Sequence, residues 1–357
     1  MLKAILSNIY EYFVNRRNRK FQISKIYSSD NFPKSEKYFK VKYNAKVISI
    51  GNLSAGGTGK TPLAIEIVNS YIPAGLKVCI IGRNYKAKSI EGNEKEKSGN
   101  VIFGIDKNGN RTSSQLIGDE MYLIQSRTNT IAISGPKKYI NAAVAEQTFH
   151  PDLMIIDDGF QHQWIMRDLD IVIIDKYTLE KPLVFPLGKL REPLTSLIRA
   201  DIIFYPELSD LSAIHKYLKD DALICAFKII PDKPYPLFDE IQLFDNSSKE
   251  INFIPIVGIA NPSRFFYTLN ELTIKYDRRL AKIFDDHHRY REKDIEHIIE
   301  QAKTTHSAII TTEKDAVKIS LYKDIFIKNQ IAVYIVPIKF KIVSNENEFI
   351  QKVNSIF

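Results

Sequence analysis

The chain has 357 residues, 44% of them hydrophobic and 26% charged, which excludes a disordered or low-complexity protein and predicts two domains. Its net charge of +8, from 50 Lys and Arg against 42 Asp and Glu, suits an anionic partner without choosing between nucleic acid, anionic lipid and phosphorylated metabolites. Cys79 and Cys225 are far apart and form no CxxC pair, which excludes a disulfide scaffold or cysteine-rich zinc site and favours a reducing compartment.

Residues 1–20 predict an amphipathic helix that ends in a basic cluster. One helical stripe carries Leu2, Ile5, Leu6, Ile9 and Phe13, and the basic cluster is Arg16, Arg17, Arg19 and Lys20. Two interpretations are open: a terminal helix docked on its own domain, or an interfacial helix with its apolar face among acyl chains and its cluster near lipid phosphates. No uncharged apolar run reaches the roughly 18–20 residues of a spanning helix, and Glu11 interrupts any signal-peptide pattern.

From residue 47 onward, short apolar runs alternate with segments of helical periodicity. The pattern predicts strands at 47–50, 77–81, 101–105, 130–134, 153–156 and 171–174, and helices at 61–71, 119–125 and 137–149. The polar residues 86–100 predict a mobile surface loop, and residues 107–109 predict a hairpin turn. This alternation is typical of an α/β fold with a doubly wound, mostly parallel sheet.

The alternation changes after about residue 205, and prolines at 231, 234 and 236 mark a boundary. Further strands are predicted at 253–257, 308–310 and 332–336, and helices at 262–269 and 292–302. We therefore expect a second, smaller α/β domain. The expected organisation is a membrane-associating helix at 1–20, a larger domain at 21–225, and a C-terminal domain at 226–357 that closes a cleft.

A glycine-rich segment lies between a predicted strand and a predicted helix, as a Walker A loop requires. It reads Ser54-Ala55-Gly56-Gly57-Thr58-Gly59-Lys60-Thr61. Glycines let backbone N–H groups converge on phosphate oxygens, and the following helix adds its positive N-terminal end. Lys60 is suited to reach the β- and γ-phosphates of ATP, and the Thr61 hydroxyl is suited to hold Mg²⁺. Ser54 stands where the strict pattern has glycine, but the context still predicts a P-loop NTPase-like domain.

Two adjacent carboxylates, Asp157 and Asp158, follow the strand at 153–156. Carboxylates at the carboxyl end of a buried parallel strand point into the crevice where such sheets bind ligands. There they are suited to bind Mg²⁺, whereas Asp-Asp-Gly on its own is ordinary turn chemistry. Because the glycine-rich loop predicts a nucleotide, we favour the metal site.

Gly118-Asp119-Glu120 precedes a predicted helix. Acidic residues are common in the first turn of a helix because they complement its dipole, and taken alone the segment favours that interpretation. The alternative is a general base, which needs a carboxylate near the γ-phosphate and an acceptor hydroxyl.

In this order along the chain, these segments resemble tetraacyldisaccharide 4′-kinase, the lipid A 4′-kinase family of Gram-negative bacteria. The resemblance covers roughly residues 47–318 and rests on ISIGNLSAGGTGKTP (48–62), GDE (118–120), DDGFQH (157–162), RDLDIVIID (167–175), PLGKLREP (186–193), GIANPSRF (258–265), DHHRY (286–290) and TTEKDAVK (311–318). DDGFQH and TEKDAVK are the specific parts. One departure is Arg83-Asn84-Tyr85, where the family usually has Arg-Gly-Tyr.

The resemblance implies roles for individual residues. Lys60 and the pair Asp119 and His287 match the catalytic positions, with His288 as the alternative to His287. Thr61, Glu120, Asp157 and Asp158 are implied at Mg²⁺, and residues 54–61 at ATP. The residues implied at the substrate are Arg83, Gln161, His162 and Arg191.

The implied activity is transfer of the γ-phosphoryl of ATP to the 4′-hydroxyl of a tetraacylated glucosamine disaccharide 1-phosphate, giving lipid IVA. The implied setting is peripheral, on the cytoplasmic face of the bacterial inner membrane. We expect no nucleic-acid partner and no obligate protein partner. The family's two α/β domains would close over the substrate, because the segments that contain Lys60 and His287 lie in different predicted domains.

Three other classes of protein compete with this interpretation. A GTPase switch needs an Asn/Thr-Lys-x-Asp motif, but in Thr312-Glu313-Lys314-Asp315 the lysine comes one place too late. A nucleic-acid-binding ATPase needs a basic stripe with adjacent aromatics, whereas only the N-terminal cluster is dense here. A non-catalytic binding module does not need the combined loop, acidic pair and Gly-Asp-Glu segment. A transition-metal cluster at residues 285–288 lacks the i,i+4 spacing of such sites.

Overall fold

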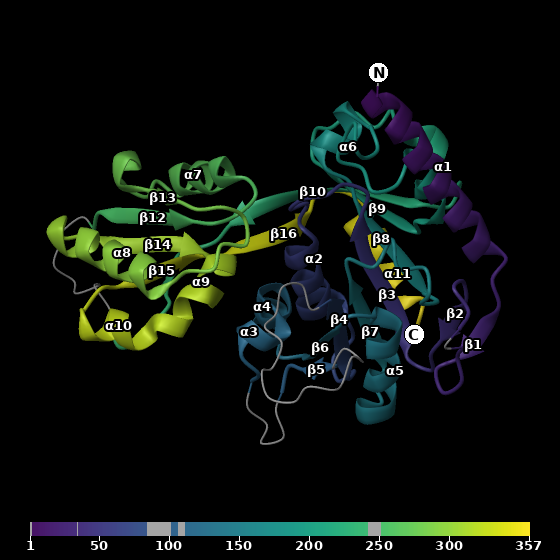
Figure 1. The fold of residues 1–357 in the computed structure, drawn as a ribbon, viewed down its shortest axis with the longest axis horizontal. Coiled ribbons are helices and arrows are strands. Elements are labelled where there is room, and N and C mark those ends of the chain that lie inside the picture. The colour runs from purple at the N-terminus through teal and green to yellow at the C-terminus, as the bar shows by residue number, and fades with distance from the viewer. Residues whose placement is uncertain (1, 34, 84–100, 106–110, 242–250) are drawn as a thin grey trace. The chain divides into compact units, whose positions relative to one another are not determined.

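The structure is a computed structural model that describes residues 2–33, 35–83, 101–105, 111–241 and 251–357 (Figure 1). The chain forms two compact units: Met1–Ile229 with Phe340–Phe357 make unit 1, and Ile230–Lys339 make unit 2. The predicted loop at 86–100, the predicted turn at 107–109 and the residues Asn84 and Tyr85 lie outside the described residues.

A nine-stranded sheet forms the centre of unit 1. Its strands are β3 (Lys46–Asn52), β4 (Val78–Arg83), β5 (Ile102–Phe103), β6 (Ile131–Gly135), β7 (Leu153–Asp157), β8 (Leu169–Ile173), β9 (Ile202–Pro206), β10 (Leu223–Pro231) and β16 (Ile338–Ile342). They are arranged in the order β16-β10-β9-β8-β3-β7-β4-β6-β5. From β10 to β6 every neighbouring pair is parallel, and β5 is antiparallel to β6. This confirms the predicted α/β fold with a mostly parallel sheet.

The connections after β3 and β7 leave in opposite directions. β3 lies between β7 and β8, and the chain passes from β3 across β7 to β4, but from β7 across β3 to β8. In register, Ile50 of β3 pairs with Asp157 of β7, so the carboxyl ends of the two strands lie side by side. In open α/β sheets, ligands bind in the crevice at such a switch point.

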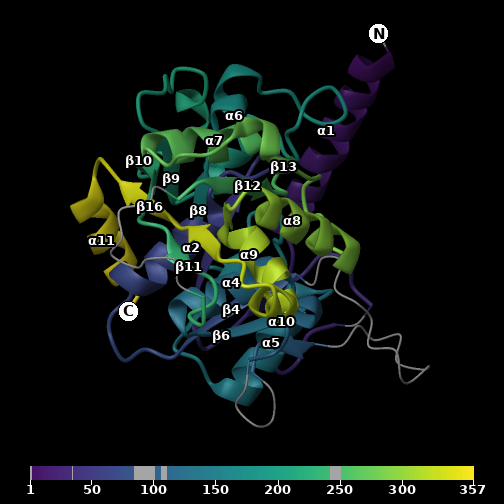
Figure 2. The same cartoon turned by 90° about the vertical axis from the view of Figure 1, so that its left-hand side faces the viewer.

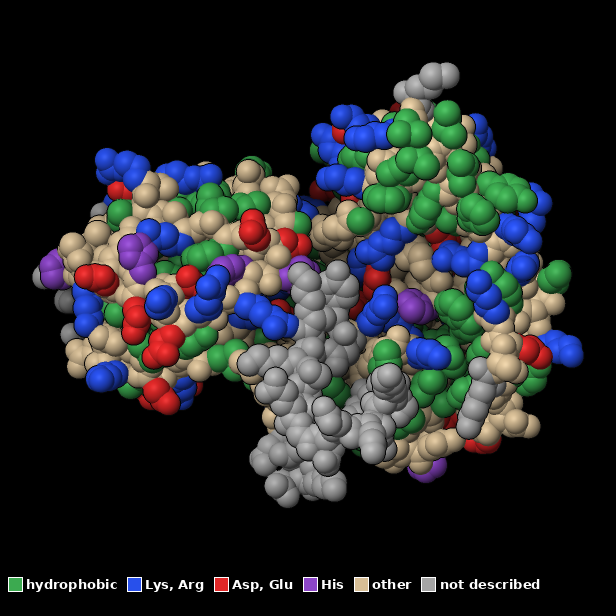
Figure 3. Space-filling model, viewed as in Figure 1, with side chains coloured by type: hydrophobic (Ala, Val, Ile, Leu, Met, Phe, Trp, Pro, Cys, Tyr) green, Lys and Arg blue, Asp and Glu red, His purple; other side chains and the backbone are tan. Residues whose placement is uncertain are grey.

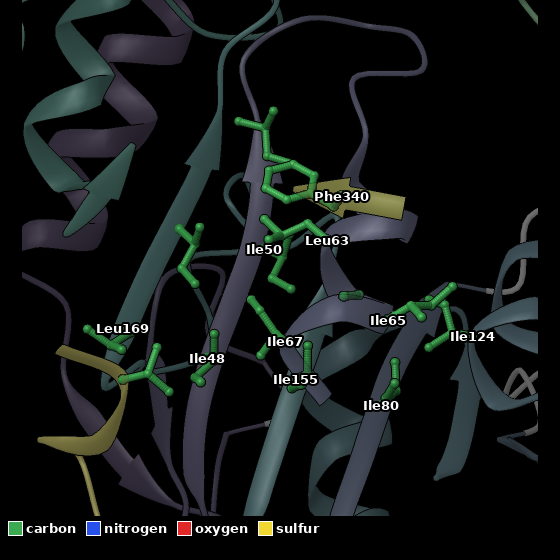
Figure 4. Packing of buried hydrophobic residues seen from close by; sticks show 14 of the residues in the cluster. Ile48, Ile50, Leu63, Ile65, Ile67, Ile80, Ile124, Ile155, Leu169 and Phe340 are labelled. Carbon is green, nitrogen blue, oxygen red and sulfur yellow. The ribbon is translucent and has the colours of Figure 1, made fainter. Parts of the chain in front are cut away.

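Helices and apolar side chains cover both faces of this sheet, because its strands are apolar on both sides. The helical segments are α2 (Lys60–Glu66), η1 (Ile67–Tyr71), α3 (Ser114–Ile117), α4 (Asp119–Thr128), α5 (Lys138–Phe149), α6 (Lys176–Glu180), η2 (Leu194–Arg199), η3 (His215–Tyr217) and α11 (Glu346–Asn354). On one face Leu63 of α2 and Ile124 of α4 pack with Ile48 and Ile80 (Figure 4). On the other face Ala142 of α5 packs with strand residues that alternate with these.

The N-terminal helix α1 (Leu2–Gln22) has two different faces. The residues that it buries in unit 1 are Ser7, Val14, Asn18 and Phe21. The predicted apolar stripe stays exposed, and the exposed fractions of Leu2, Ile5, Leu6, Ile9 and Phe13 are 70%, 49%, 44%, 46% and 57%. Features of both open interpretations are therefore present, because α1 docks on its own unit while its apolar stripe faces away from it. Its N-terminal end lies at the edge of unit 1 (Figures 1 and 2).

Two short strands follow α1. These are β1 (Ile26–Ser28) and β2 (Lys40–Lys42), which pair in parallel. Val41 of β2 bridges to Ile165 and belongs to the core on the α5 side of the main sheet. Of the helices that the structure describes, none combines the length and apolar character needed to cross a bilayer.

Unit 2 is built on a smaller sheet with the order β11-β15-β14-β12-β13. Its strands are β11 (Tyr235–Pro236), β12 (Phe253–Val257), β13 (Lys282–Ile283), β14 (Ala308–Thr312) and β15 (Val333–Val336). Its helical segments are α7 (Pro262–Glu271), η4 (Arg278–Leu280), α8 (Glu292–Thr304), α9 (Glu313–Ile319), η5 (Ser320–Tyr322) and α10 (Lys323–Lys328). Apolar clusters cover both faces, one with Ile298 of α8 and the other with Phe265 of α7.

The course of the chain differs from the expected domain boundaries at the C-terminus. The expected second domain runs from 226 to 357, whereas unit 2 ends at Lys339 and Phe340–Phe357 belong to unit 1. The physical reason is apolar burial, because Phe340 of β16 and Phe349 of α11 pack around Phe204 in the core of unit 1. The strands β10 and β16 both run across the boundary between the units.

Candidate functional site

The glycine-rich loop at 54–61 joins β3 to α2 at the carboxyl end of the sheet. Gly56 and Gly59 have φ angles of 133° and 102°, which side chains other than glycine adopt only with strain. The Asn52 side-chain amide stiffens the loop, because its Nδ2 donates to the Ser54 carbonyl at 2.8 Å and to the Thr58 hydroxyl at 3.0 Å. The backbone N–H groups of the loop are thereby held in a turn suited to an anion.

Ser54, the departure from the strict Walker A pattern, is buried and bonded. Its hydroxyl donates to Oδ2 of Asp175 at 2.7 Å, and the other Asp175 oxygen accepts from the N–H and hydroxyl of Thr178 at the start of α6. The next residue, Ala55, donates its N–H to the carbonyl of Lys189 at 2.9 Å. The start of the loop is therefore held by a side chain and by a neighbouring segment.

Asp157 and Asp158 end β7 beside this loop. Asp158 has a φ of 48°, the left-handed region, and a Cβ on Gly159 would come within 2.4 Å of the Ser49 hydroxyl. The Asp158 carboxylate faces two cations. Its Oδ1 lies 3.3 Å from Nζ of Lys60, and its Oδ2 accepts a 2.8 Å hydrogen bond from Nη1 of Arg191. The structure thus brings Lys60, Asp158 and Arg191 together.

Lys138, which the sequence analysis did not select, lies beneath the acidic pair. It is 1% exposed, and its ammonium donates to the carbonyls of Asp157 at 2.5 Å and Asp158 at 2.7 Å. Burial lowers the pKa of this lysine to about 8, against the opposing effect of the two carboxylates. The lysine therefore fixes the main chain that carries both carboxylates.

The two carboxylates differ in charge environment. Burial and the charge of Glu120 raise the pKa of Asp157 to about 6. Burial also disfavours the charged form of Asp158, but the cations Lys60, Lys138 and Arg191 outweigh it and hold its pKa well below the usual range. Asp157 is therefore the carboxylate whose charge is under-compensated.

A carboxylate whose negative charge is not balanced by neighbouring cations is a suitable ligand for a metal ion. Asp157 Oδ1 is buried and accepts no hydrogen bond from the described residues. Among the described residues, no group of three or more His, Cys, Asp or Glu side chains is placed to hold a metal ion by itself. Mg²⁺ is typically held by one or two carboxylates together with waters and substrate phosphates, so an open pair of this kind suits it.

The Gly118-Asp119-Glu120 segment begins α4. Gly118 has a φ of 96°, and α4 approaches β4 closely because a Cβ on Gly82 would overlap the Met121 side chain. The charge of Glu120 acts on Asp157, so the first turn of α4 faces the acidic pair. Asp119 precedes Glu120 in the same turn.

The loop after β7 also carries Gln161 and His162. The Gln161 Nε2 donates to the Asn52 carbonyl at 2.9 Å, which ties this loop to the end of β3. Burial and the nearby charge of Lys138 lower the pKa of His162 to about 3, and the charges of Asp158 and Arg83 also act on it. His162 is therefore neutral near pH 7, and Arg83, at the end of β4, belongs to the same electrostatic environment.

His287 and His288 lie in unit 2, after β13. His287 has a φ of 59°, and its Nε2 lies 3.2 Å from Nζ of Lys314 and 3.7 Å from Asp286 Oδ2. His288 stacks on Phe284, with ring centroids 4.4 Å apart, and contacts Asp294 at 3.2 Å. The His288 side chain is thus engaged in packing within unit 2, and the His287 ring contacts polar side chains of the same unit.

The segment 311–318 has a structural role within unit 2. Asp315 is fully buried and accepts from the Gly258 N–H at 2.9 Å and the Thr312 hydroxyl at 2.8 Å, while Lys318 pairs with its other oxygen. These bonds link the start of α9 to the end of β12.

The site residues expected from sequence therefore fall into two groups. In the first group Lys60 of the glycine-rich loop and Arg191 both contact Asp158 at the switch point of unit 1, where Asp157 precedes it. The charge of Glu120 acts on Asp157 and that of Arg83 acts on the neutral His162, and Asp119 lies next to Glu120 in the first turn of α4. His287 belongs to unit 2. The residues missed were Lys138, Asn52 and Asp175. Asp175 could have been found, because it follows a strand in the same way as Asp157.

The known proteins with similar sequences that are described here share one name. The sequence model of the LpxK family, described as Tetraacyldisaccharide-1-P 4′-kinase, matches residues 1–357. The tetraacyldisaccharide 4′-kinase of Desulfotalea psychrophila is 34% identical over 294 residues, covering 77% of this chain and 79% of that protein. That of Halothermothrix orenii is 33% identical over 331 residues, covering 84% and 80%.

A solved structure shares the fold. It is the crystal structure of LpxK from Aquifex aeolicus in complex with ATP, which superposes with a TM-score of 0.71 at 24% identity over the whole of both chains. Because the family model spans the complete sequence and relatives exceed 30% identity over most of it, the chain belongs to the tetraacyldisaccharide-1-P 4′-kinase family.

Proposed function

We propose that this chain transfers the γ-phosphoryl group of ATP to the 4′-hydroxyl of a tetraacylated glucosamine disaccharide 1-phosphate. The observation that carries the proposal is that Lys60 and Arg191 both contact Asp158 at the switch point of the main sheet. The chain that forms this site belongs to the kinase family. A P-loop lysine beside an acidic residue is the arrangement with which P-loop enzymes transfer phosphoryl groups from a nucleotide.

The glycine-rich loop is the proposed binding site for ATP phosphates. Its residues Ser54, Ala55, Gly56, Gly57, Thr58 and Gly59 turn around the start of α2, and Lys60 follows at the first helical position. The Lys60 ammonium lies 3.3 Å from Oδ1 of Asp158. Its ammonium can exchange this partner for the β- and γ-phosphate oxygens, where it offsets charge that develops during transfer.

The residues that would hold Mg²⁺ are Thr61, Glu120, Asp157 and Asp158. The buried Asp157 Oδ1 without a described partner and the raised pKa of this carboxyl both favour a cation beside it. A bound ion would supply charge neutralisation for the nucleotide phosphates. Lys138 holds the main chain of both aspartates through two hydrogen bonds, and so fixes the backbone from which these two proposed ligands project.

Asp119 is the proposed proton acceptor. The acceptor hydroxyl forms a bond to the γ-phosphorus, the bond from that phosphorus to the β–γ bridging oxygen breaks, and ADP leaves. The hydroxyl proton passes to the Asp119 carboxylate, and His287 is the residue to which the family resemblance gives the orienting role. Substrate anions would meet Arg83 and Arg191, and sugar hydroxyls would meet Gln161 and His162.

The exposed stripe of α1 is the proposed contact with the cytoplasmic face of the inner membrane. Apolar side chains gather over this part of unit 1 (Figure 3), and the neighbouring segment adds exposed Leu183, Phe185 and Leu187. Tyr10 of α1 packs edge-on against Phe185, with centroids 5.9 Å apart. Apolar side chains flanked by Arg16, Arg19 and Lys20 suit peripheral binding to an anionic bilayer.

The proposal is tested with purified protein, ATP, Mg²⁺ and the tetraacyl disaccharide 1-phosphate in mixed micelles. We expect one phosphate to be added to the lipid, with ATP preferred over GTP, and Lys60→Met to abolish the product. A deacylated, soluble disaccharide is the parallel acceptor. Success with the soluble sugar alongside failure with the lipid would contradict the proposed substrate, and a strong preference for GTP would favour a switch protein.

A further inference from the structure

The segment 183–192 lies between α1 and the nucleotide site and is bonded to both. On one side, Arg191 reaches Asp158 at 2.8 Å, its N–H donates to the Leu53 carbonyl at 2.7 Å, and the Lys189 carbonyl accepts from Ala55. Two of these bonds end on the acidic pair and the glycine-rich loop, and the third ends on Leu53, the residue before the loop. The position of this segment therefore determines where the Arg191 guanidinium meets Asp158.

On the other side, α1 holds three residues of the same segment through four hydrogen bonds. The Ser7 hydroxyl donates to the Val184 carbonyl at 3.0 Å, and the Tyr10 hydroxyl donates to the Arg191 carbonyl at 2.9 Å. The third residue is Glu192, which is fully buried and accepts from Arg17 at 2.7 Å and from Asn18 at 3.0 Å. The two residues that α1 holds most directly are therefore Arg191 and its neighbour.

Asn18 is the centre of this contact. It is 9% exposed, its Nδ2 donates to Glu192 and lies 3.3 Å from the Ser196 hydroxyl, and its Oδ1 accepts from Gln163 Nε2 at 2.6 Å. Gln163 follows His162 in the loop that begins with the acidic pair. Asn18 thus bonds two segments of the site: its Nδ2 contacts Glu192, next to Arg191, and its Oδ1 contacts Gln163 in the loop after the acidic pair.

We infer that α1 is a positioning element of the nucleotide site, in which Asn18 and Tyr10 hold Arg191 on Asp158. This inference rests on the proposed kinase function. It concerns how α1 affects nucleotide binding, whereas the membrane contact proposed above concerns the other face of the helix. The polar face of α1 that carries it, with Ser7 and Asn18 buried, is distinct from the exposed apolar stripe. Removing the partner of a metal ligand commonly lowers metal affinity about 10–100-fold, and Arg191 is such a partner of Asp158, a proposed ligand of Mg²⁺.

The test measures Mg·ATP affinity of the full chain in detergent, without lipid, by isothermal titration calorimetry. Asn18→Asp replaces the donor to Glu192 by a second carboxylate at about the same place, and we expect roughly tenfold weaker binding. Asn8→Asp makes the same chemical change at an exposed position of α1 and should leave affinity unchanged. Equal affinities of the two variants would overturn the inference.

Two further variants separate positioning from general damage to the fold. In an Arg191→Gln background the effect of Asn18→Asp should largely disappear, because the group that it positions is gone, and an undiminished effect would overturn the inference. Tyr10→Phe keeps the ring on Phe185 and removes only the bond to the Arg191 carbonyl, so it should weaken binding about threefold. If Asn18→Asp does not fold by circular dichroism, Tyr10→Phe decides: an affinity equal to wild type overturns the inference.

The outcome is distinguishable from failure of the proposed function. Wild-type protein that binds Mg·ATP but phosphorylates no lipid would contradict the proposed activity and leave the positioning role testable. Wild-type protein that binds no nucleotide would contradict both.

Discussion

The Ser54 hydroxyl donates a 2.7 Å hydrogen bond to the Asp175 carboxylate, so the first position of the phosphate loop is held by a side chain. The strict Walker A pattern has glycine there, and glycine has no group to make this bond. Asp175 in turn caps α6, so the loop is fastened to the element that follows β8. Here the departure from the pattern supplies rigidity to the loop.

Removing this bond should weaken nucleotide binding. Ser54→Ala leaves the Asp175 oxygen without its donor, and we expect ATP affinity to fall roughly 3–10-fold because a hydrogen bond to a charged group contributes about 1–2 kcal/mol. The control is Ser212→Ala, which removes the same kind of bond, from Ser212 to Asp210, on the exposed surface. Unchanged ATP affinity in Ser54→Ala would show that the bond does not shape the loop.

Replacing Asp157 and replacing Asp158 should have opposite effects on the stability of the protein. Burial raises the pKa of Asp157 to about 6 in the folded protein, above the roughly 4 of an unfolded aspartate, so between these values the folded protein binds more protons. Its free energy of unfolding therefore falls as pH rises through that window. Asp157→Asn should stabilise the nucleotide-free protein at pH 7 by about 1–3 kcal/mol, with no gain below pH 4.

Thermal melts of Asp157→Asn and of its neighbour variant Asp158→Asn across pH 4 to 8 check this prediction. Asp158→Asn should instead destabilise the protein at pH 7, because Asp158 is paired with Lys60 and Arg191 and its pKa is held low. A loss of stability in both variants at pH 7 would mean that Asp157 is already compensated in the nucleotide-free protein.

Asp119 should affect the rate far more than binding. If its carboxylate accepts the hydroxyl proton, Asp119→Ala should lower kcat by about 10²–10⁴-fold with little change in the KM for ATP. The competing role is complementing the dipole of α4, which Asp324 in the first turn of α10 also performs. Asp324→Ala is therefore the matched control, and a kcat loss as small as that of the control would remove Asp119 from the mechanism.

The exposed stripe of α1 should carry vesicle binding without affecting nucleotide binding. Ile5→Glu combined with Ile9→Glu places two charges among the apolar side chains and should greatly reduce sedimentation with anionic phospholipid vesicles. Leu208→Glu, at an apolar residue that is 98% exposed elsewhere in unit 1, should have no effect. Undiminished sedimentation of the double variant would mean that another surface binds the membrane. These substitutions test membrane binding alone, whereas deleting residues 1–20 would also remove Tyr10 and Asn18 and so affect the nucleotide site.

Periodicity and turn chemistry were enough to predict the central architecture. The predicted helix at 61–71 corresponds to α2 and η1, and the strand at 153–156 corresponds to β7 with Asp157 at its end. These elements carry local signals, such as an apolar strand that runs into glycines or carboxylates. The gathering of the loop and the acidic pair followed from the rule that parallel strands place their carboxyl ends at one edge.

What could not be predicted depends on contacts between distant parts of the chain. Lys138 lies in a polar run that is typical of a surface helix, and its burial under Asp157 is set only by the packing of α5 on the sheet. The docking face of α1 uses Ser7 and Asn18, so no apolar period marks it. The return of Phe340–Phe357 to unit 1 likewise depends on aromatic packing across the sequence.

The most direct measurement of the central claim locates the phosphate that the protein adds. Wild-type protein is incubated with γ-labelled ATP and the tetraacyl disaccharide 1-phosphate, and the product is fragmented by tandem mass spectrometry. The account predicts one labelled phosphate on the 4′-oxygen of the non-reducing glucosamine, and none with Lys60→Met. Label at another position, or release of free phosphate without any labelled lipid, would contradict it.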